Sequence, residues 1–312
     1  MTHGNGRFAP SPSGDLHLGN LRTAVIAELW ARFTGRGFVL RVDDIDRGRS
    51  SEEAARRQIG DLEAVGVHFD GEVVHESDCI DDYAAALAEL SGRGLVYECY
   101  CSRRDIREAS RAPHTAPDRY PGTCRDLTDA ERERRRRDLA AAGRVPALRL
   151  RSRVARWTAR EVFAVDTGDG SPGYTGEVDD FILRRGGLVT VHENPAESGY
   201  AYNLAVVVDD ARSGVDQVVR GDDLLASAPR QAYLAHLLGL PEVEYVHVPL
   251  VLGPTGKRLA KRDGAVTLRQ LPGDTPAQRA AVARRWIEDS LGPDALEDPR
   301  LLSREPVVWR GP

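Results

Sequence analysis

The sequence predicts an α/β fold with a parallel sheet, and three observations support this prediction. A short apolar start at 6–9, an irregular Pro/Ser/Gly loop and a run with apolar residues at four-residue steps up to Phe33 predict a strand, a loop and an amphipathic helix. Residues 38–42 predict a second strand, which ends in acidic residues that begin at Asp43. The chain therefore opens with a βαβ unit, the repeat from which parallel sheets are built.

The remaining elements follow from periodicity and from turn residues. Helices at 50–65 and 81–93 are expected to cover the sheet. An irregular region from 96 to 124 precedes a polar, Arg-rich helix at 127–144. Beyond it we expect strands at 147–151 and 162–166, a segment at 179–185 that leads back to the main sheet, a buried strand at 201–210, a helix at 227–238, a strand ending at Leu252 and a helix at 277–291.

Composition is that of an ordinary globular protein. The 312 residues are 41% hydrophobic and 29% charged, which is enough for one or two domains with a full core. No apolar run approaches the roughly 18 residues of a membrane span, and the N-terminus lacks a signal-peptide pattern. These observations predict a cytoplasmic protein that does not contact a membrane.

Charge gives only weak evidence for a nucleic-acid partner. The net charge of −5 lacks the basic surplus that such proteins often carry. The densest basic run, 132–137, is interrupted by glutamate, which favours a solvated helix face over an RNA contact.

The loop before the first helix is a candidate phosphate site. It brings His17, Gly19 and Asn20 to the first helical turn, where free backbone N–H groups and the helix dipole attract an anion. The alternative is that His17 is a capping or surface residue, since Pro-rich turns precede many helices.

A second loop, 253–264, carries four cations after the apolar run 246–252. These side chains could stabilise a leaving pyrophosphate, although a charge cluster in a loop can also be merely solvated. The cations are Lys257, Arg258, Lys261 and Arg262.

Together, the two loops carry a family resemblance. His-Leu-Gly-Asn at 17–20 resembles the HIGH signature of class I aminoacyl-tRNA synthetases, and Arg-Leu-Ala-Lys-Arg at 258–262 resembles their KMSKS loop, with Ala260 in place of the usual serine. The background up to about Leu271 is similar to the glutamyl subclass, and in particular to its truncated paralogues, the glutamyl-queuosine tRNA(Asp) synthetases.

The resemblance implies a Rossmann-like, doubly wound parallel sheet with an inserted zinc-containing α+β subdomain and a short helical C-terminal part. The implied division is a catalytic domain at 1–95 and 186–252, an insert at 96–185, and the KMSKS-like loop with the helical part at 253–312. After the last predicted helix about twenty residues remain, too few for the anticodon-binding domain of a full glutamyl enzyme. No function is assigned to the extra residues near 186–199.

The resemblance also implies an activity. L-Glutamate would be activated with ATP and Mg²⁺ as glutamyl adenylate and transferred to the queuosine base at the first anticodon position of tRNA(Asp), by a monomeric enzyme. Two alternatives remain open at this point: a shortened glutamyl-tRNA synthetase that charges a tRNA 3′ end, and a tRNA-binding module without catalysis.

Site residues carry over from the resemblance by position. Asp43, where the family usually has glutamate, would hold the substrate ammonium group, although it could instead cap the next helix. Arg220 offers a planar fork to the side-chain carboxylate. The glutamate pocket would comprise Arg7, Phe8, Ala9, Pro10, Ser11, Asp43, Tyr202 and Arg220. The ATP site would comprise His17, Gly19, Asn20, Arg258, Leu259, Ala260, Lys261 and Arg262, with His17, Asn20 and Lys261 as catalytic residues.

Three of the four cysteines suggest a metal. In a cytosolic chain, clustering of Cys99, Cys101 and Cys124 favours zinc over a disulfide. Metal chemistry alone points to His114 as the fourth ligand. The resemblance points instead to Tyr120, which begins a Tyr-x-x-x-Cys motif typical of the family. One structural zinc is expected, the alternative being three unliganded thiols.

Overall fold

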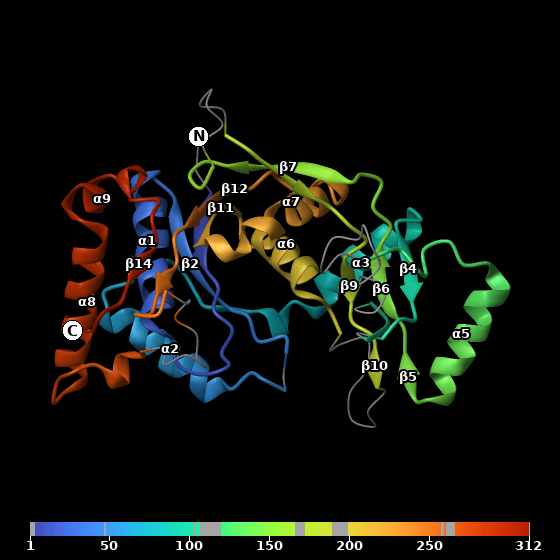
Figure 1. The fold of residues 1–312 in the computed structure, drawn as a ribbon, viewed down its shortest axis with the longest axis horizontal. Helices are drawn as coiled ribbons and strands as arrows, with labels where there is room; N and C mark the ends of the chain where they lie inside the picture. Colours follow the sequence, from blue (N-terminus) through green and yellow to red (C-terminus); the bar gives the residue numbers. More distant parts are fainter. Residues whose placement is uncertain are drawn as a thin grey trace.

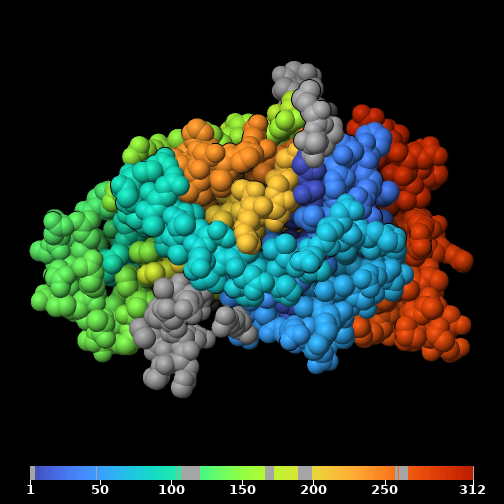
Figure 2. All heavy atoms as spheres, turned by 180° about the vertical axis from the view of Figure 1, so that it is seen from behind, coloured from blue at the N-terminus to red at the C-terminus, as the bar shows by residue number. Residues whose placement is uncertain are grey.

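The computed structural model describes residues 4–46, 48–102, 104–106, 120–165, 172–188, 199–256, 259 and 266–311. The molecule is elongated in Figure 1, with the C-terminal helices at one end and a small sheet with one outlying helix at the other. The same two parts lie at opposite edges when the molecule is viewed from behind in Figure 2. Among the described residues, no helix combines the length and the apolar character that a membrane crossing requires.

A seven-stranded sheet forms the centre of the molecule. Its order is β3-β2-β1-β11-β12-β7-β8, and all neighbours are parallel except the antiparallel edge pair β7 and β8. Because the chain proceeds from β1 outwards to β2 and later returns to β11 on the other side, the strand order reverses between β1 and β11. The strands are β1 (Asn5–Phe8), β2 (Gly37–Val42), β3 (Val74–His75), β7 (Arg156–Glu161), β8 (Tyr174–Glu177), β11 (Val215–Gly221) and β12 (Glu244–Val248).

Helices cover both faces of this sheet, as a doubly wound fold requires. Val219 of β11 packs in the core cluster that holds α1 (Leu18–Phe33), whereas its neighbour Val218 packs with Ala228 at the start of α7 (Ala228–Leu237). Successive strand residues therefore meet opposite layers. The other helices are α2 (Glu52–Ala64), α3 (Ile80–Gly92), α5 (Asp129–Ala141), α6 (Tyr202–Arg212), α8 (Pro276–Leu291) and α9 (Pro293–Glu297).

A smaller antiparallel sheet lies beside the large one. It has the order β4-β6-β9, and α5 stands at its outer side in Figure 1 with no buried residue. The exposed helix face predicted for the Arg-rich run is confirmed. The strands of this sheet are β4 (Val96–Cys99), β6 (Ala147–Leu150) and β9 (Ile182–Arg184), and the short pairs elsewhere are β5 (Arg144–Val145) with β10 (Gly187–Leu188) and β13 (Val251–Leu252) with β14 (Val307–Val308).

Three predicted elements are wrong. Residues 201–210 form helix α6 rather than a strand, because the helix is buried between the sheet and its neighbours and its short apolar run has no one-sided pattern. Residues 162–165 form no strand, because the nearest strand, β7, ends at Glu161. The segment 179–185 does not return to the main sheet, since β9 pairs with β6. Strands β7 and β8 also belong to the large sheet, although both lie within the range 96–185 that was expected to form the insert.

A buried charge network ties β1, β2 and α6 together. Arg41 donates from Nε to Asp43 Oδ1 at 2.8 Å and from a terminal nitrogen to Asp210 Oδ1 at 2.6 Å. Arg7 donates from Nε to the same Asp210 oxygen at 3.2 Å. All four side chains are nearly inaccessible, so removing one partner would leave an uncompensated buried charge, a loss of about 3–5 kcal/mol.

Glu76 lies beside this network and is 2% exposed. Burial, with a further contribution from the Asp43 carboxylate, raises the pKa of Glu76 to about 9. The native state therefore holds a proton that the unfolded chain loses near pH 4.5, and stability falls as pH rises between these two values.

The variant Glu76→Gln should remove this dependence. We expect its free energy of unfolding to rise relative to that of the original chain as pH increases from 5.5 to 7.5, with a slope of up to about 1.4 kcal/mol per pH unit. Urea unfolding at several pH values measures the difference. Glu288→Gln, at an exposed surface pair, is the control and should show a flat difference. A flat difference for Glu76→Gln as well would contradict the assignment.

Candidate active site

A cleft of about 500 Å³ opens at the carboxyl ends of β1 and β11. This is the position where the strand order reverses, and open α/β sheets bind their ligands there. Its walls include Arg7, Ser11, His17, Tyr202 and Arg220, so the structure brings together residues predicted for both the glutamate pocket and the ATP site.

The amino end of α1 forms one wall of the cleft. His17 is the N-cap: its Nδ1 accepts the Asn20 N–H at 3.2 Å, and Asn20 Oδ1 accepts the His17 N–H at 3.3 Å. With Nδ1 as acceptor, the neutral imidazole carries its proton on Nε2 and is a donor there. A Cβ at Gly19 would lie 3.0 Å from His17 Nδ1, so glycine keeps this cap undistorted. The capping alternative for His17 is therefore correct, and it is compatible with a phosphate site.

The loop between β1 and α1 is held from below by Gln58 of α2. Its Nε2 donates to the carbonyl oxygens of Ser11 at 3.1 Å and Gly14 at 2.6 Å. Gln58 is 2% exposed and also lines the cleft. The sequence alone does not show that Gln58 supports this loop, although a glutamine at an inward position of an amphipathic helix is the signal that could have identified it.

Two buried arginines form the opposite part of the cleft. Arg7, near the end of β1, pairs with Asp210 as described above. Arg220 of β11 donates from Nε to His247 Nε2 at 3.0 Å and from a terminal nitrogen to Gln231 Oε1 at 2.7 Å. Tyr202 begins α6 and is 42% exposed toward this space. This part of the site therefore combines two guanidinium groups with one accessible phenol.

Asp43 lies behind this cleft rather than in its wall. Its side chain is only about 6% exposed, and Oδ1 accepts from Arg41. Its backbone N–H donates to the Pro10 carbonyl at 3.0 Å, which joins it to the loop that lines the cleft. Burial raises the pKa of Asp43 against the opposing effect of Arg41.

Described residues in and just after the basic loop lie near the start of α1. Leu18 at the start of α1 donates its N–H to Val266 at 2.9 Å, directly after the basic loop. Leu259, inside that loop, donates to Val251 at 3.1 Å and is buried in the α1 core cluster. Arg258 and the residues 260–262, which include Ala260, Lys261 and Arg262, lie outside the described residues.

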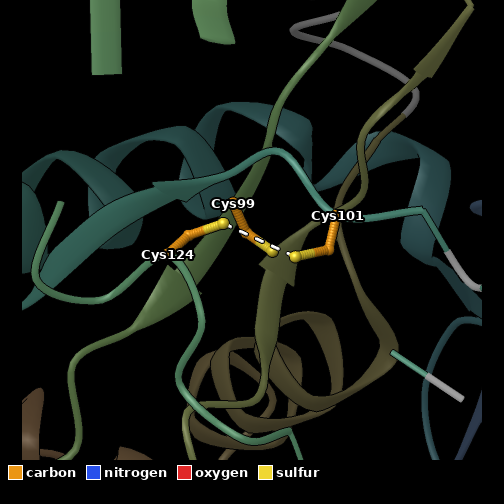
Figure 3. Close-up of side chains that lie close together, drawn as sticks. All are labelled: Cys99, Cys101 and Cys124. Atoms are coloured by element: carbon orange, nitrogen blue, oxygen red, sulfur yellow. Dashed lines mark hydrogen bonds between the residues drawn. The ribbon is translucent and has the colours of Figure 1, made fainter. Parts of the chain in front are cut away.

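Three thiols form a second candidate site. Figure 3 shows Cys99, Cys101 and Cys124 pointing toward one another, and their sulfur atoms lie within 4.8 Å. The phenol oxygen of Tyr120 is 3.3 Å from Cys99 Sγ and 3.9 Å from Cys101 Sγ. No disulfide joins these free cysteines. His114, the other candidate ligand, lies outside the described residues.

The chemistry of these donors suits a tetrahedral zinc site. Zinc binds thiolate sulfur at about 2.3 Å, which places two ligand sulfurs about 3.8 Å apart. The Cys101 and Cys124 sulfurs are 3.5 Å apart. Hydrogen bonds from the Cys101 and Cys124 thiols lower the pKa of Cys99, whereas burial raises the pKa of Tyr120. Ionisation of the phenol would therefore need a nearby cation.

Comparison with known proteins connects this geometry to a family. The family model for the catalytic domain of class I tRNA synthetases (E and Q) matches residues 5–164 and 188–283. The chain is 55% identical over 315 aligned residues to the glutamyl-Q tRNA(Asp) synthetase of Nocardia farcinica, covering 98% of this chain and 93% of that protein. It is 45% identical to the protein of the same name from Cutibacterium acnes, covering 97% and 80%.

Solved structures show the same fold. The glutamate-tRNA synthetase of Elizabethkingia anophelis superposes with a TM-score of 0.74 at 20% sequence identity, covering 98% of this chain and 68% of that one. The class I synthetase fold and the family resemblance stated from the sequence are confirmed by these matches. The chain belongs to the glutamyl-Q tRNA(Asp) synthetase family of class I tRNA synthetases.

Proposed function

We propose that this chain activates L-glutamate with ATP and transfers the glutamyl group to the queuosine base at the first anticodon position of tRNA(Asp). One observation carries the proposal: a single cleft joins the capped amino end of α1 to the buried arginines Arg7 and Arg220. The first is suited to phosphate and the second to an amino acid with a carboxylate side chain. The relatives reported above are named glutamyl-Q tRNA(Asp) synthetases, and this name supports the proposal.

In the first step, a glutamate α-carboxylate oxygen attacks the α-phosphorus of ATP. The bond from that phosphorus to the bridging oxygen breaks, and pyrophosphate leaves. His17 through Nε2–H, Asn20 and the positive end of the α1 dipole bind the phosphates, while Gly19 permits close approach of the nucleotide. Magnesium bound with ATP would neutralise part of the phosphate charge.

The glutamate pocket is proposed on the β1 and β11 side. Arg220 holds the side-chain carboxylate with Tyr202, and Arg7 with Ser11 completes the pocket along the backbone of Phe8, Ala9 and Pro10. Asp43 supplies the negative charge for the ammonium group from behind the loop, either directly or through a water. Because Asp43 is not among the residues that line the cleft, a bridging water suits the shorter side chain at a position where the family usually has glutamate.

The basic loop is proposed to close over the triphosphate. Two described residues support this proposal: Val266, which accepts the Leu18 N–H, and Leu259, whose side chain is buried. Lys261 then stabilises the negative charge that develops as pyrophosphate departs, assisted by Arg258 and Arg262. Since Ala260 lacks a hydroxyl, the loop backbone must supply what the usual serine contributes.

We further propose one structural zinc, bound by Cys99, Cys101, Cys124 and Tyr120. Zinc there would fasten the turn at 120–124 to the end of β4, within the subdomain built on the small sheet. It would supply cross-linking rather than chemistry.

The activation step and the acceptor can be tested separately. Pyrophosphate exchange with ATP and glutamate should proceed without RNA. Labelled glutamate should then reach tRNA(Asp) that carries queuosine even when its 3′ end is blocked, and should not reach tRNA(Asp) that lacks queuosine. Label that requires a free 3′ hydroxyl would indicate a shortened glutamyl-tRNA synthetase. RNA binding without exchange or transfer would indicate a binding module.

Lys261→Ala should slow adenylate formation by about 10²–10³-fold, because the charge that it stabilises exists only as pyrophosphate departs. The KM for glutamate should stay within about twofold. Single-turnover kinetics with ATP and glutamate separate the two effects. Arg285→Ala removes an exposed cation of α8 and is the control. Equal losses in rate and in glutamate binding would remove the assigned role of Lys261.

The zinc proposal predicts about one zinc per purified chain by elemental analysis. Cys124→Ser should abolish binding, Tyr120→Phe should weaken affinity by at least about tenfold, and His114→Ala should have no effect. A competitive chelator titration measures these affinities. Loss with His114→Ala but not with Tyr120→Phe would assign the fourth ligand to His114. A zinc-free original chain would leave three unliganded thiols.

A further inference from the structure

Three neighbouring strands place Arg220, His247 and Glu161 in one buried row. Arg220 of β11 is the register partner of His247 on β12, and Glu161 of β7 is the partner of Tyr245 on the same strand. Arg220 Nε lies 3.0 Å from His247 Nε2, and His247 Nδ1 lies 2.5 Å from Glu161 Oε2. His247 and Glu161 have no exposed surface, and neither lines the cleft.

The hydrogen bonds of this row fix one protonation state. A guanidinium group can only donate, so His247 Nε2 must accept. His247 therefore carries its proton on Nδ1 and donates it to Glu161. Burial lowers the pKa of His247, although the hydrogen bond to Glu161 acts in the opposite direction. The lowered pKa keeps the imidazole neutral at neutral pH. Burial opposes ionisation of Glu161, but its hydrogen bonds hold its pKa below the usual value.

Glu161 is itself held in one orientation. Its Oε1 accepts the backbone N–H groups of Phe163 at 2.9 Å and Ala164 at 2.7 Å, directly after β7. The His247 N–H approaches the same oxygen at 3.3 Å. Only Oε2 faces the imidazole. The carboxylate is thus a rigid support for the histidine rather than a mobile base.

The two arginines of the cleft are anchored in different ways. Arg7 contacts a carboxylate, Asp210, which offsets its charge. Arg220 makes no ion pair within 4.0 Å among the described residues and is held by neutral partners: His247, Gln231 and, at 3.4 Å, the Leu224 carbonyl. These bonds use three of its five N–H groups. The remaining two, and an unneutralised charge, are left for a ligand.

We propose that Glu161 and His247 are positioning residues that give Arg220 its selectivity for an amino acid with a carboxylate side chain. They orient the guanidinium without neutralising it, so that the cost of burying its charge is recovered only when an anionic ligand binds. The identity of that ligand as glutamate rests on the proposed function. The orientation itself rests on the hydrogen bonds alone.

The isosteric variant Glu161→Gln tests this arrangement. The backbone N–H groups of Phe163 and Ala164 require the amide oxygen on their side, so the amide N–H₂ faces His247 Nδ1. His247 must then carry its proton on Nε2, where it opposes the Arg220 N–H. We expect nitrogen-15 NMR of the imidazole to show this change of tautomer in the free protein.

Kinetics provide the second readout. In Glu161→Gln, the KM for glutamate should rise about 10- to 100-fold, with kcat within about threefold, and the preference for glutamate over glutamine should fall by a similar factor. Glu244→Gln is the matched control, since it makes the same change on β12 at the end remote from the cleft, where it bonds Gln217. It should leave the KM and the tautomer unchanged.

A second pair of variants covers the case in which Glu161→Gln does not fold. His247→Gln retains an acceptor for Arg220 and a donor for Glu161 and should keep most of the glutamate preference, whereas His247→Leu should lose it. The proposal is overturned if the tautomer and KM are unchanged in Glu161→Gln, or if His247→Gln and His247→Leu lose the preference for glutamate over glutamine to the same extent. If the original chain does not activate glutamate but the tautomer still switches, the proposed function fails and the positioning of Arg220 stands.

Discussion

The parallel pairing of β1 with β11 positions every part of the candidate site. It joins Asn5 to Val215 and Gly6 to Gln217, segments that lie far apart in the chain. A Cβ at Gly6 would lie 2.8 Å from Ala31 Cβ, so glycine lets α1 pack closely on this strand. Because both strands end at the same edge of the sheet, the helix terminus that follows β1 and the arginine of β11 face one cleft.

Buried charge gives this cleft its chemical character. Arg7 and Arg41 share Asp210, whereas Arg220 is held by groups without net charge. A buried guanidinium without a counter-ion is unfavourable in the free protein, and an incoming carboxylate relieves that cost. In the proposal made above, selectivity for a carboxylate side chain therefore depends on the residues that contact each arginine: an aspartate for Arg7 and uncharged groups for Arg220.

The sequence was most informative where structure is local. The helix predicted from four-residue steps up to Phe33, the loop with His17 and Asn20, and the convergence of three cysteines depend on neighbours in the chain or on a spaced motif, and the observed geometry agrees with them. Residues 201–210 were predicted as a strand because a short apolar run buried on all sides has no period. The roles proposed for His247 and Glu161 could not be predicted, because they arise from the register between three strands. The burial of Asp43 could not be predicted either, because its charge network includes residues on distant elements.

The proposed activity requires one cleft to hold the amino acid and the nucleotide side by side. The most direct measurement is the affinity of a non-hydrolysable glutamyl-adenylate analogue, determined by titration calorimetry in competition with ATP and with glutamate. We expect the analogue to exclude both substrates and to bind at least about 100-fold more tightly than either, because its two halves occupy adjoining parts of one site. An analogue that binds no more tightly than glutamate alone, or that leaves ATP binding unaffected, would contradict it.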